Sequence, residues 1–261
     1  MAKKRLIPKL LLSASKFNSQ KLVVVITKQF NERIEIGDPV SQAKIFQDQS
    51  ADELVFINID SNNNDINKLA GVIRKVSEEI FMPMTVGGGV NNEADFRLLL
   101  QNGADKISIN SKAVNDPEFI TMASQKYGAQ CVVVSIDYKL NQNGDYKVYI
   151  DGGKIESKYS PLEFAILAEE LGAGELMLTC IDNDGMRNGI NLDITKQVEE
   201  RVKIPIISGG GCGLAKDFTN GFLIGKADAI CAGSFFAHRD QNLVQTRAQI
   251  VNAGVNIRVQ N

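Results

Sequence analysis

The chain contains an internal repeat, and no other feature of the sequence limits its fold as strongly. A run of three glycines occurs at Gly87–Gly89 and again, 122 residues later, at Gly209–Gly211. Glu53 and Glu175 are separated by the same 122 residues within two similar blocks. A nearly constant offset across several blocks indicates two copies of one structural unit. We therefore expect two homologous halves, about 1–125 and 126–261.

Each run of glycines follows a short apolar segment with a proline and precedes an amphipathic helical pattern. A strand that ends in glycines and leads into a helix exposes backbone N–H groups at the positive end of the helix dipole, which suits phosphate. The alternative is a tight strand-to-helix turn that only needs small residues. Because the run occurs twice at matching positions, we favour phosphate binding.

Apolar strand-like segments alternate with helical patterns along the whole chain, and no linker divides it. Eight such units predict that residues 1–261 form a single α/β domain. We expect this domain to be a closed (β/α)8 TIM barrel and not an open doubly wound sheet. The expected barrel strands are 5–12, 54–59, a segment ending at Gly87, 106–109, 130–137, 175–180, 204–207 and 229–232. We also expect a strand at 22–27, inside an insertion at 13–36, and a turn at 141–145 joining two short strands.

Composition and charge exclude several classes of function. The net charge of −2 gives no electrostatic basis for binding nucleic acid or an anionic membrane. The four cysteines lack metal-ligand spacing and indicate reduced, buried thiols in a cytoplasmic protein. His238 is the only histidine, so we expect no metal site, no cofactor and a surface role for this residue. The basic, apolar N-terminus resembles a signal peptide, but Pro8 and Lys9 favour a first barrel strand.

In a (β/α)8 barrel the chemistry lies on the loops that follow the strands. Asp137 ends the most apolar strand of the chain, so we favour a catalytic role over a turn cap. For Asp60 and Asp182, hydrogen-bonded support of the site is as plausible as catalysis. Nucleotide-binding motifs such as GxxxxGK[ST] and GxGxxG are absent.

Six blocks of the sequence resemble the cyclase subunit of imidazole glycerol phosphate synthase, and the resemblance covers essentially the whole chain. These blocks are Gly37–Val40, Asp52–Phe56, Thr85–Gly89, Gly103–Asn110, Val133–Asp137 and Ile181–Gly185. The resemblance implies a glutaminase partner at the N-terminal face of the barrel and ammonia transfer through the barrel core. It also implies a lyase-class synthase component of a glutamine amidotransferase complex.

The resemblance assigns roles to particular residues. Arg5, Glu53, Lys106 and Glu175 match a charged gate at the barrel entrance; the alternative is an ion-pair plug without a conduit role. The implied phosphate- or substrate-binding residues are Thr85, Gly88, Gly89, Ser108, Asn110, Ser111, Asp182, Asp184, Gly185, Gly210, Gly211 and Ser234.

The sequence departs from this family at the end of the first strand. The family uses two aspartates as acid and base; Asp137 matches one, but Leu11 stands where the other is expected. Leucine cannot transfer a proton, and the loss of an acid–base group commonly costs about 10²–10⁴-fold in rate. A family lysine on the following loop is also replaced, by Ile26, with Lys28 as a substitute.

Ile7–Leu12 resembles a paralogous branch of the family found with bacterial surface-polysaccharide genes. By that resemblance the chain relays ammonia for conversion of an N-acetyl group into an acetamidino group, working with a separate sugar amidotransferase. The substrate would be a small phosphorylated compound or a nucleotide sugar. Two alternatives remain: a genuine histidine-pathway cyclase that uses Asp182 or Asp184 as the second acid, and a non-catalytic scaffold that activates a glutaminase.

Overall fold

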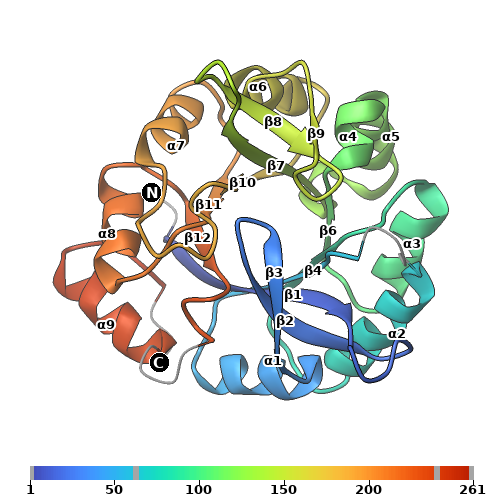
Figure 1. Ribbon diagram of the computed structural model, residues 1–261. Coiled ribbons are helices and arrows are strands. Elements are labelled where there is room, and N and C mark those ends of the chain that lie inside the picture. The colour runs from blue at the N-terminus through green and yellow to red at the C-terminus, as the bar shows by residue number, and fades with distance from the viewer. Residues whose placement is uncertain (1–2, 61–64, 238–241, 259–261) are drawn as a thin grey trace.

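A closed ring of eight parallel strands forms the centre of the molecule. The computed structural model describes residues 3–60, 65–237 and 242–258. The barrel strands are β1 (Arg5–Ala14), β4 (Leu54–Asn58), β5 (Met84–Gly87), β6 (Lys106–Ile109), β7 (Val132–Leu140), β10 (Glu175–Cys180), β11 (Ile206–Gly209) and β12 (Ala229–Ala232). Pairing of β7 with β10 and of β12 with β1 closes the ring (Figure 1). The predicted (β/α)8 barrel is confirmed.

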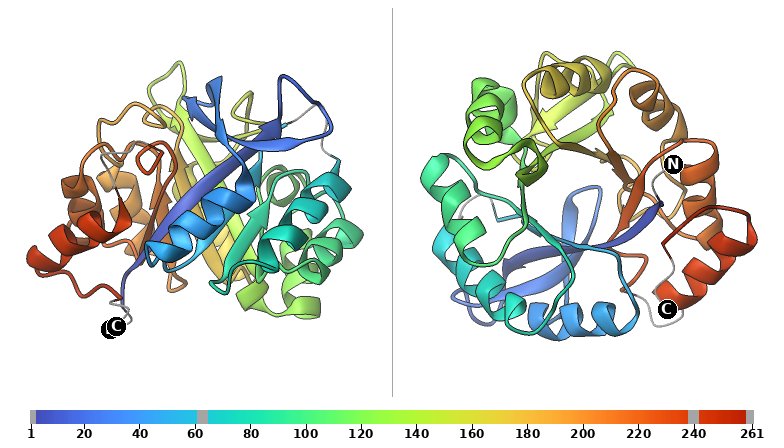
Figure 2. Two further views of the ribbon diagram at one scale, coloured as in Figure 1. Left: turned by 90° about the horizontal axis from the view of Figure 1, so that it is seen from below. Right: turned by 180° about the vertical axis from the view of Figure 1, so that it is seen from behind.

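Helices cover the outside of this ring (Figure 2). They are α1 (Pro39–Asp48), α2 (Ile66–Ser77), α3 (Glu93–Gln101), α4 (Ser111–Asn115), α5 (Glu118–Tyr127), α6 (Pro161–Glu170), α7 (Leu192–Glu199), α8 (Ala215–Leu223) and α9 (Leu243–Asn252), with a 3-10 turn at Ala129–Cys131. The Asp38 side chain caps α1, and Ser160 with Glu163 forms a capping box at α6. The expected helix starts at Pro39 and Ser160–Pro161 are confirmed.

Two antiparallel additions extend barrel strands above the ring. β2 (Leu22–Lys28) and β3 (Asn31–Gly37) form a hairpin that pairs with the end of β1. β8 (Tyr146–Ile150) pairs with the end of β7, and β9 (Ile155–Glu156) pairs with β8. The β2–β3 hairpin projects over the barrel mouth at the C-terminal ends of the parallel strands (Figures 1 and 2).

The structure corrects several predicted boundaries. β1 continues to Ala14, because its last four residues pair with β2. The sequence did not predict β3, whose residues are exposed or half-exposed and therefore show no apolar alternation. The short helix α4 and strand β9 were also missed. Three of the four cysteines are buried free thiols as expected, but Cys131 is half-buried.

The repeat is visible in equivalent contacts of the two halves. Asp105 accepts a hydrogen bond from the amide of Met84 at the start of β5 (2.8 Å), and Asp228 accepts one from Ile206 at the start of β11 (3.1 Å).

A Cβ atom on Gly88, where φ is +95°, would lie 2.0 Å from the carbonyl oxygen of Asn58. Packing therefore already requires glycine at this position, whether or not the turn binds phosphate.

The apolar core has two parts. The larger part lies between the strands and the surrounding helices, and even-numbered residues of β1 such as Leu6, Leu10 and Leu12 belong to it. The smaller part lies inside the barrel and consists of Ile7, Val55, Val133, Met177, Ile207, Ala229 and Cys231. Strand alternation thus separates a helix-facing side from a barrel-facing side of each strand.

Candidate functional site

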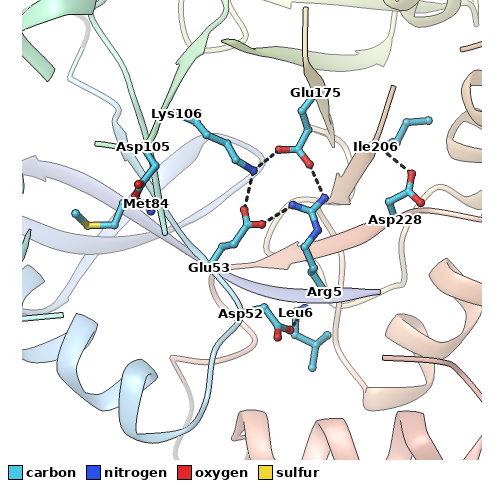
Figure 3. A network of polar contacts seen from close by, with 10 residues as sticks. All are labelled: Arg5, Leu6, Asp52, Glu53, Met84, Asp105, Lys106, Glu175, Ile206 and Asp228. Carbon is cyan, nitrogen blue, oxygen red and sulfur yellow. Dashed lines mark hydrogen bonds and ion pairs between the residues drawn. The ribbon is translucent and has the colours of Figure 1, made fainter. Parts of the chain in front are cut away.

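Four charged side chains form a closed ring at the N-terminal end of the barrel. Arg5 donates to Glu53 and Glu175, and the Lys106 Nζ donates to the same two carboxylates at 3.1 and 2.8 Å (Figure 3). The side chains of Arg5, Glu53 and Glu175 are at most 10% exposed. The structure therefore brings together the four residues that the sequence analysis assigned to a gate.

The alternating charges of this ring stabilise one another. Burial alone would lower the pKa of Arg5, but the Glu175 and Glu53 carboxylates outweigh burial and raise it. Burial would raise the pKa of Glu53, but Arg5 and Lys106 outweigh burial and lower it. Both groups are thus held in their charged forms, as expected for buried charges that are fully paired.

An apolar layer lies directly above the charged ring. Ile7 follows Arg5 on the barrel-facing side of β1, and Met177 follows Glu175 on β10. All members of this inner cluster are at most 1% exposed. The barrel axis is therefore closed at two levels in this structure, by the ring and by the apolar layer.

Thr85 lies beside this layer. Its register neighbours are Val55 of the layer and Lys106 of the ring, and it is 1% exposed. Its hydroxyl oxygen has no hydrogen-bond partner in the described part of the chain. The resemblance implied phosphate or substrate binding for Thr85, and the structure places Thr85 inside the barrel, deeper than the mouth.

A cavity of about 530 Å³ opens at the barrel mouth above the apolar layer. Its floor includes Lys9, Leu11 and Asp137. Predicted phosphate- or substrate-binding residues of the first half line its wall: Gly88, Gly89, Ser108, Asn110 and Ser111. Phe30 and Arg33 of the β2–β3 hairpin also line the cavity.

Asp137 lies in β7, where the antiparallel pairing with β8 begins, and it lines this cavity. Ser135 Oγ donates to its Oδ1 at 3.4 Å, and the Thr179 side chain also hydrogen-bonds to it. Burial raises the pKa of Asp137, the positive charge of Lys9 opposes this rise, and the negative charge of Asp184 adds to it. A carboxyl group that lines a cavity and has a raised pKa is a candidate acid–base group.

Leu11 lines the cavity where the resemblance implied a second aspartate. The acidic group that shares the electrostatic environment of Asp137 is instead Asp184. Thr27 of the hairpin donates its hydroxyl to Asp184 at 2.9 Å, and burial raises the pKa of Asp184. Lys28, considered as a substitute for the missing loop lysine, is exposed and does not line the cavity.

Lys9 is a site residue that the sequence analysis did not recognise. Its Nζ donates to Thr179 Oγ1 at 3.2 Å, at the inner end of the cavity. Strand alternation from Arg5 through Ile7 places Lys9 on the barrel-facing side of β1. The available signal was the position of Lys9 four residues after Arg5, an even spacing that puts both side chains on the same side of a strand.

Other predicted acidic residues support the loops. Asp60 accepts from Ser13, the Ala14 amide and Arg33, and so ties the β2–β3 hairpin to the barrel. Asp182 accepts from the amide of Leu140 at 2.9 Å. For both residues, these contacts match the supporting role.

The predicted phosphate residues of the second half lie apart from this cavity. They are Gly185, Gly210, Gly211 and Ser234, and none of them lines it. A Cβ on Gly185 would lie 2.2 Å from the carbonyl oxygen of Thr27, so the hairpin packs closely on this loop. Gly211 accepts a hydrogen bond from the Gly189 amide at 2.9 Å. His238 lies outside the described residues.

No group of three or more histidine, cysteine or acidic side chains that could hold a metal ion occurs in residues 3–60, 65–237 and 242–258. Within these same ranges, no helix has the length and apolar character needed to cross a bilayer.

Comparison with known proteins gives the family. The model of the histidine biosynthesis protein family matches residues 13–241. "Putative imidazole glycerol phosphate synthase subunit hisF2" of Prochlorococcus marinus (strain MIT 9313) is 44% identical over 261 residues, covering 100% of both chains. The HisF subunit of imidazole glycerol phosphate synthase from Alkaliphilus metalliredigens (strain QYMF) is 40% identical over 222 residues, 85% of this chain and 88% of the relative. The corresponding HisF subunit of Clostridium botulinum (strain Langeland / NCTC 10281 / Type F) is 40% identical over 226 residues, 86% of this chain and 89% of the relative. The chain therefore belongs to the histidine biosynthesis protein family and, within it, to the HisF-like subunits of imidazole glycerol phosphate synthase.

Proposed function

We propose that this protein receives ammonia from a glutaminase partner and relays it through the barrel to an acceptor at the mouth. The observation that carries this proposal is the order of groups along the barrel axis. A paired charged ring, which includes Arg5 and Lys106, is followed by an apolar layer and then by a cavity with Asp137 at its floor. An apolar layer disfavours charged ammonium and water more strongly than neutral ammonia.

The unpartnered hydroxyl of Thr85 supports this route. A buried hydroxyl without a hydrogen-bond partner lowers the stability of the fold. Such a group beside the apolar layer therefore indicates a function for the hydroxyl. Ammonia can both donate and accept a hydrogen bond, and it would satisfy this hydroxyl in passing. In this closed structure the ring must open before ammonia can enter, and docking of the partner would supply the free energy for that change.

The glutaminase would dock at the N-terminal face of the barrel, beside the charged ring. Phe81, which precedes β5 at this end, is 94% exposed. Ile45, Leu223 and Ile224, toward the C-terminal ends of α1 and α8, are also exposed. Exposed apolar side chains at the entrance of the proposed route are typical of a docking surface.

The docking surface can be tested with a matched pair of variants. Phe81→Asp should prevent copurification with the glutaminase and abolish its stimulation by this subunit. Phe17→Asp is the control, because Phe17 is equally exposed (94%) but precedes β2 at the opposite, mouth end. Equal loss of binding in both variants, or in neither, would contradict this placement of the partner.

For the acceptor, we propose conversion of an N-acetyl group into an acetamidino group on a surface-polysaccharide sugar, together with a separate sugar amidotransferase. Leu11 at the cavity floor argues against ordinary ring closure, since it removes one of two proton-transfer groups. The cavity of about 530 Å³ is of the size that holds a small phosphorylated compound or part of a nucleotide sugar.

Gene replacement in the source organism tests this function. Deletion of the gene should remove acetamidino groups from the surface polysaccharide, as measured by mass spectrometry after growth on ¹⁵N-amide glutamine. In vitro, the subunit should raise glutamine hydrolysis by its glutaminase partner. An unchanged polysaccharide in the deletion strain would reject the acetamidino role. Turnover of the histidine-pathway cyclase substrate with ammonium at normal cyclase rates would reject the acetamidino acceptor in favour of ring closure.

One observation favours a second candidate, the cyclase reaction of histidine biosynthesis. Asp184 lies close enough to Asp137 to raise its pKa, and could act as the second acid in place of Leu11. An Asp184→Asn variant separates the two candidates. Cyclase turnover by the unaltered protein that is lost in this variant would support ring closure.

A further inference from the structure

A continuous chain of polar groups crosses the inner end of the mouth cavity. Lys9 Nζ donates to the Thr179 hydroxyl oxygen at 3.2 Å, and the Thr179 side chain hydrogen-bonds to the Asp137 carboxylate. The three residues come from β1, β10 and β7, so only the closed barrel brings them together. Thr179 is 1% exposed, whereas Lys9 and Asp137 both line the cavity.

This chain lies where the proposed ammonia route meets the cavity. Below Lys9 on the same side of β1 is Ile7 of the apolar layer, and above it is Leu11. Below Thr179 on β10 is Met177 of the same layer. A molecule that leaves the apolar layer therefore meets the ammonium group of Lys9 and the carboxylate of Asp137 first.

We infer that Lys9 is a catalytic residue, which acts with Asp137 as the proton-transfer pair for addition of ammonia to an acceptor carbonyl carbon in this cavity. The inference rests on the proposed function, because ammonia must arrive at the inner end of the cavity. It places nitrogen addition in this barrel and gives Lys9 the proton-donating role that Leu11 cannot have.

The step balances in atoms and charge. The ammonia lone pair forms a bond to the acceptor carbon, and the π electrons of the carbon–oxygen bond move to the oxygen. Lys9 gives that oxygen a proton, and Asp137 takes a proton from the newly bonded nitrogen. The product of this step is a neutral carbinolamine, and loss of its hydroxyl group with a nitrogen-bound proton, as water, gives the C=N bond of the acetamidino group. The Thr179 hydroxyl then returns the proton from Asp137 to Lys9, which restores both charges.

Two substitutions of Lys9 separate proton transfer from charge. Lys9→Met removes both the charge and the proton, whereas Lys9→Arg keeps the charge but holds its proton too tightly to donate it. We expect both to lower acetamidino formation by about 10²–10⁴-fold in the gene-replacement strain. Thr179→Val, which removes the bridging hydroxyl at nearly constant volume, should lower it as well. Lys196→Met on the outer surface of α7 is the control and should have no effect.

Three readouts keep the outcomes distinct. Thermal unfolding and glutamine hydrolysis with the partner should match the unaltered protein in each variant, which excludes misfolding and loss of docking. In ¹³C NMR of labelled aspartate, Lys9→Met should raise the pKa of Asp137, whereas Lys9→Arg should leave it nearly unchanged. Full activity of Lys9→Arg would show that Lys9 supplies only charge, and would overturn the inference.

Failure of this inference differs from failure of the proposed function. Suppose nitrogen addition takes place on the separate amidotransferase. Lys9→Met would then support normal acetamidino formation, which overturns the inference while the relay stands. Suppose instead that deletion of the whole gene leaves acetamidino groups intact. The proposed function, and this inference with it, would then be rejected.

Discussion

The charged side chains at the two ends of the barrel differ in how completely they are paired. At the entrance, each carboxylate of the ring contacts two cations, and each cation contacts two carboxylates. At the mouth, Asp137 and Asp184 share the charge of Lys9. Full pairing favours fixed charges, whereas incomplete pairing leaves a carboxylate ready to exchange a proton. At the residue scale this difference separates a fully paired ring of charges from a site that suits proton transfer.

The charged ring makes a prediction about stability. Glu53→Gln keeps the shape of the side chain but leaves Arg5 with one carboxylate, and breaking a buried pair typically costs about 3–5 kcal/mol. We expect a loss in the free energy of unfolding at the lower end of that range, measured by urea denaturation. Glu79→Gln, on the exposed pair with Lys44, should have little effect. A Glu53 variant as stable as the Glu79 control would show that the ring contributes no net stability.

The mouth makes a prediction about pH. The pKa of Asp137 is raised in the folded protein above its ordinary 3.8, so the folded state takes up a proton at higher pH than the unfolded state. The Asp137 carboxyl therefore increases the free energy of unfolding as the pH falls toward 4 and decreases it as the pH rises.

Urea denaturation at several pH values checks this sign. Relative to Asp137→Asn, the unaltered protein should gain free energy of unfolding between pH 7 and pH 4. The exposed Asp145→Asn variant serves as the reference and should follow the unaltered protein. A difference that shrinks as the pH falls would contradict a raised pKa.

At the scale of elements, the β2–β3 hairpin joins the two halves across the mouth. Thr27 donates to the Asp184 carboxylate, and the Gln29 amide and side chain donate to the Asp184 and Asp182 carbonyls at 2.8 and 2.9 Å. Arg33 at the other side of the hairpin pairs with Asp60. The insertion thus shapes the cavity as well as extending β1.

Removal of one hairpin contact should loosen the loop after β10. Thr27→Val deletes the hydroxyl that donates to Asp184, and a hydrogen bond to a charged group is worth about 1.5–3 kcal/mol. We expect faster amide hydrogen exchange across residues 181–189, with unchanged exchange in α8. Thr219→Val within α8 is the control, since its hydroxyl bonds only along its own helix. Unchanged exchange at 181–189 would mean that the hairpin does not hold this loop.

At the scale of the whole molecule, α9 belongs to the outer layer of helices and connects the end of the described chain to the first barrel strands (Figure 1). Arg247 of α9 pairs with the buried Asp52 carboxylate at 2.9 Å and also donates to the carbonyls of Ser50 and Arg258. Asp52 in turn accepts from the Leu6 amide at 2.7 Å. One buried ion pair therefore connects β1, the loop before β4 and the end of the chain.

The ion pair between Arg247 and Asp52 predicts the effect of Arg247→Met. Burial already raises the pKa of Asp52, and the change removes the Arg247 cation that pairs with this buried carboxylate. We therefore expect a loss of about 3 kcal/mol in the free energy of unfolding. Urea denaturation measures the loss, with the exposed Arg74→Met of α2 for comparison. If the two variants unfold at the same urea concentration, the pair contributes no net stability.

The sequence by itself determined the barrel, because the repeat, the alternation of strands and helices and the strand periodicity are local properties of the chain. Strand position also indicated the first glycine turn and Asp137, whereas the four charged residues of the ring were indicated by the resemblance to a known family. The tertiary structure alone decided that Lys9 reaches Thr179 and Asp137, that Asp184 joins them and that Thr85 lies inside the barrel. The reason is that these groups come from strands far apart in sequence, and only closure of the ring sets which of their side chains share one interior.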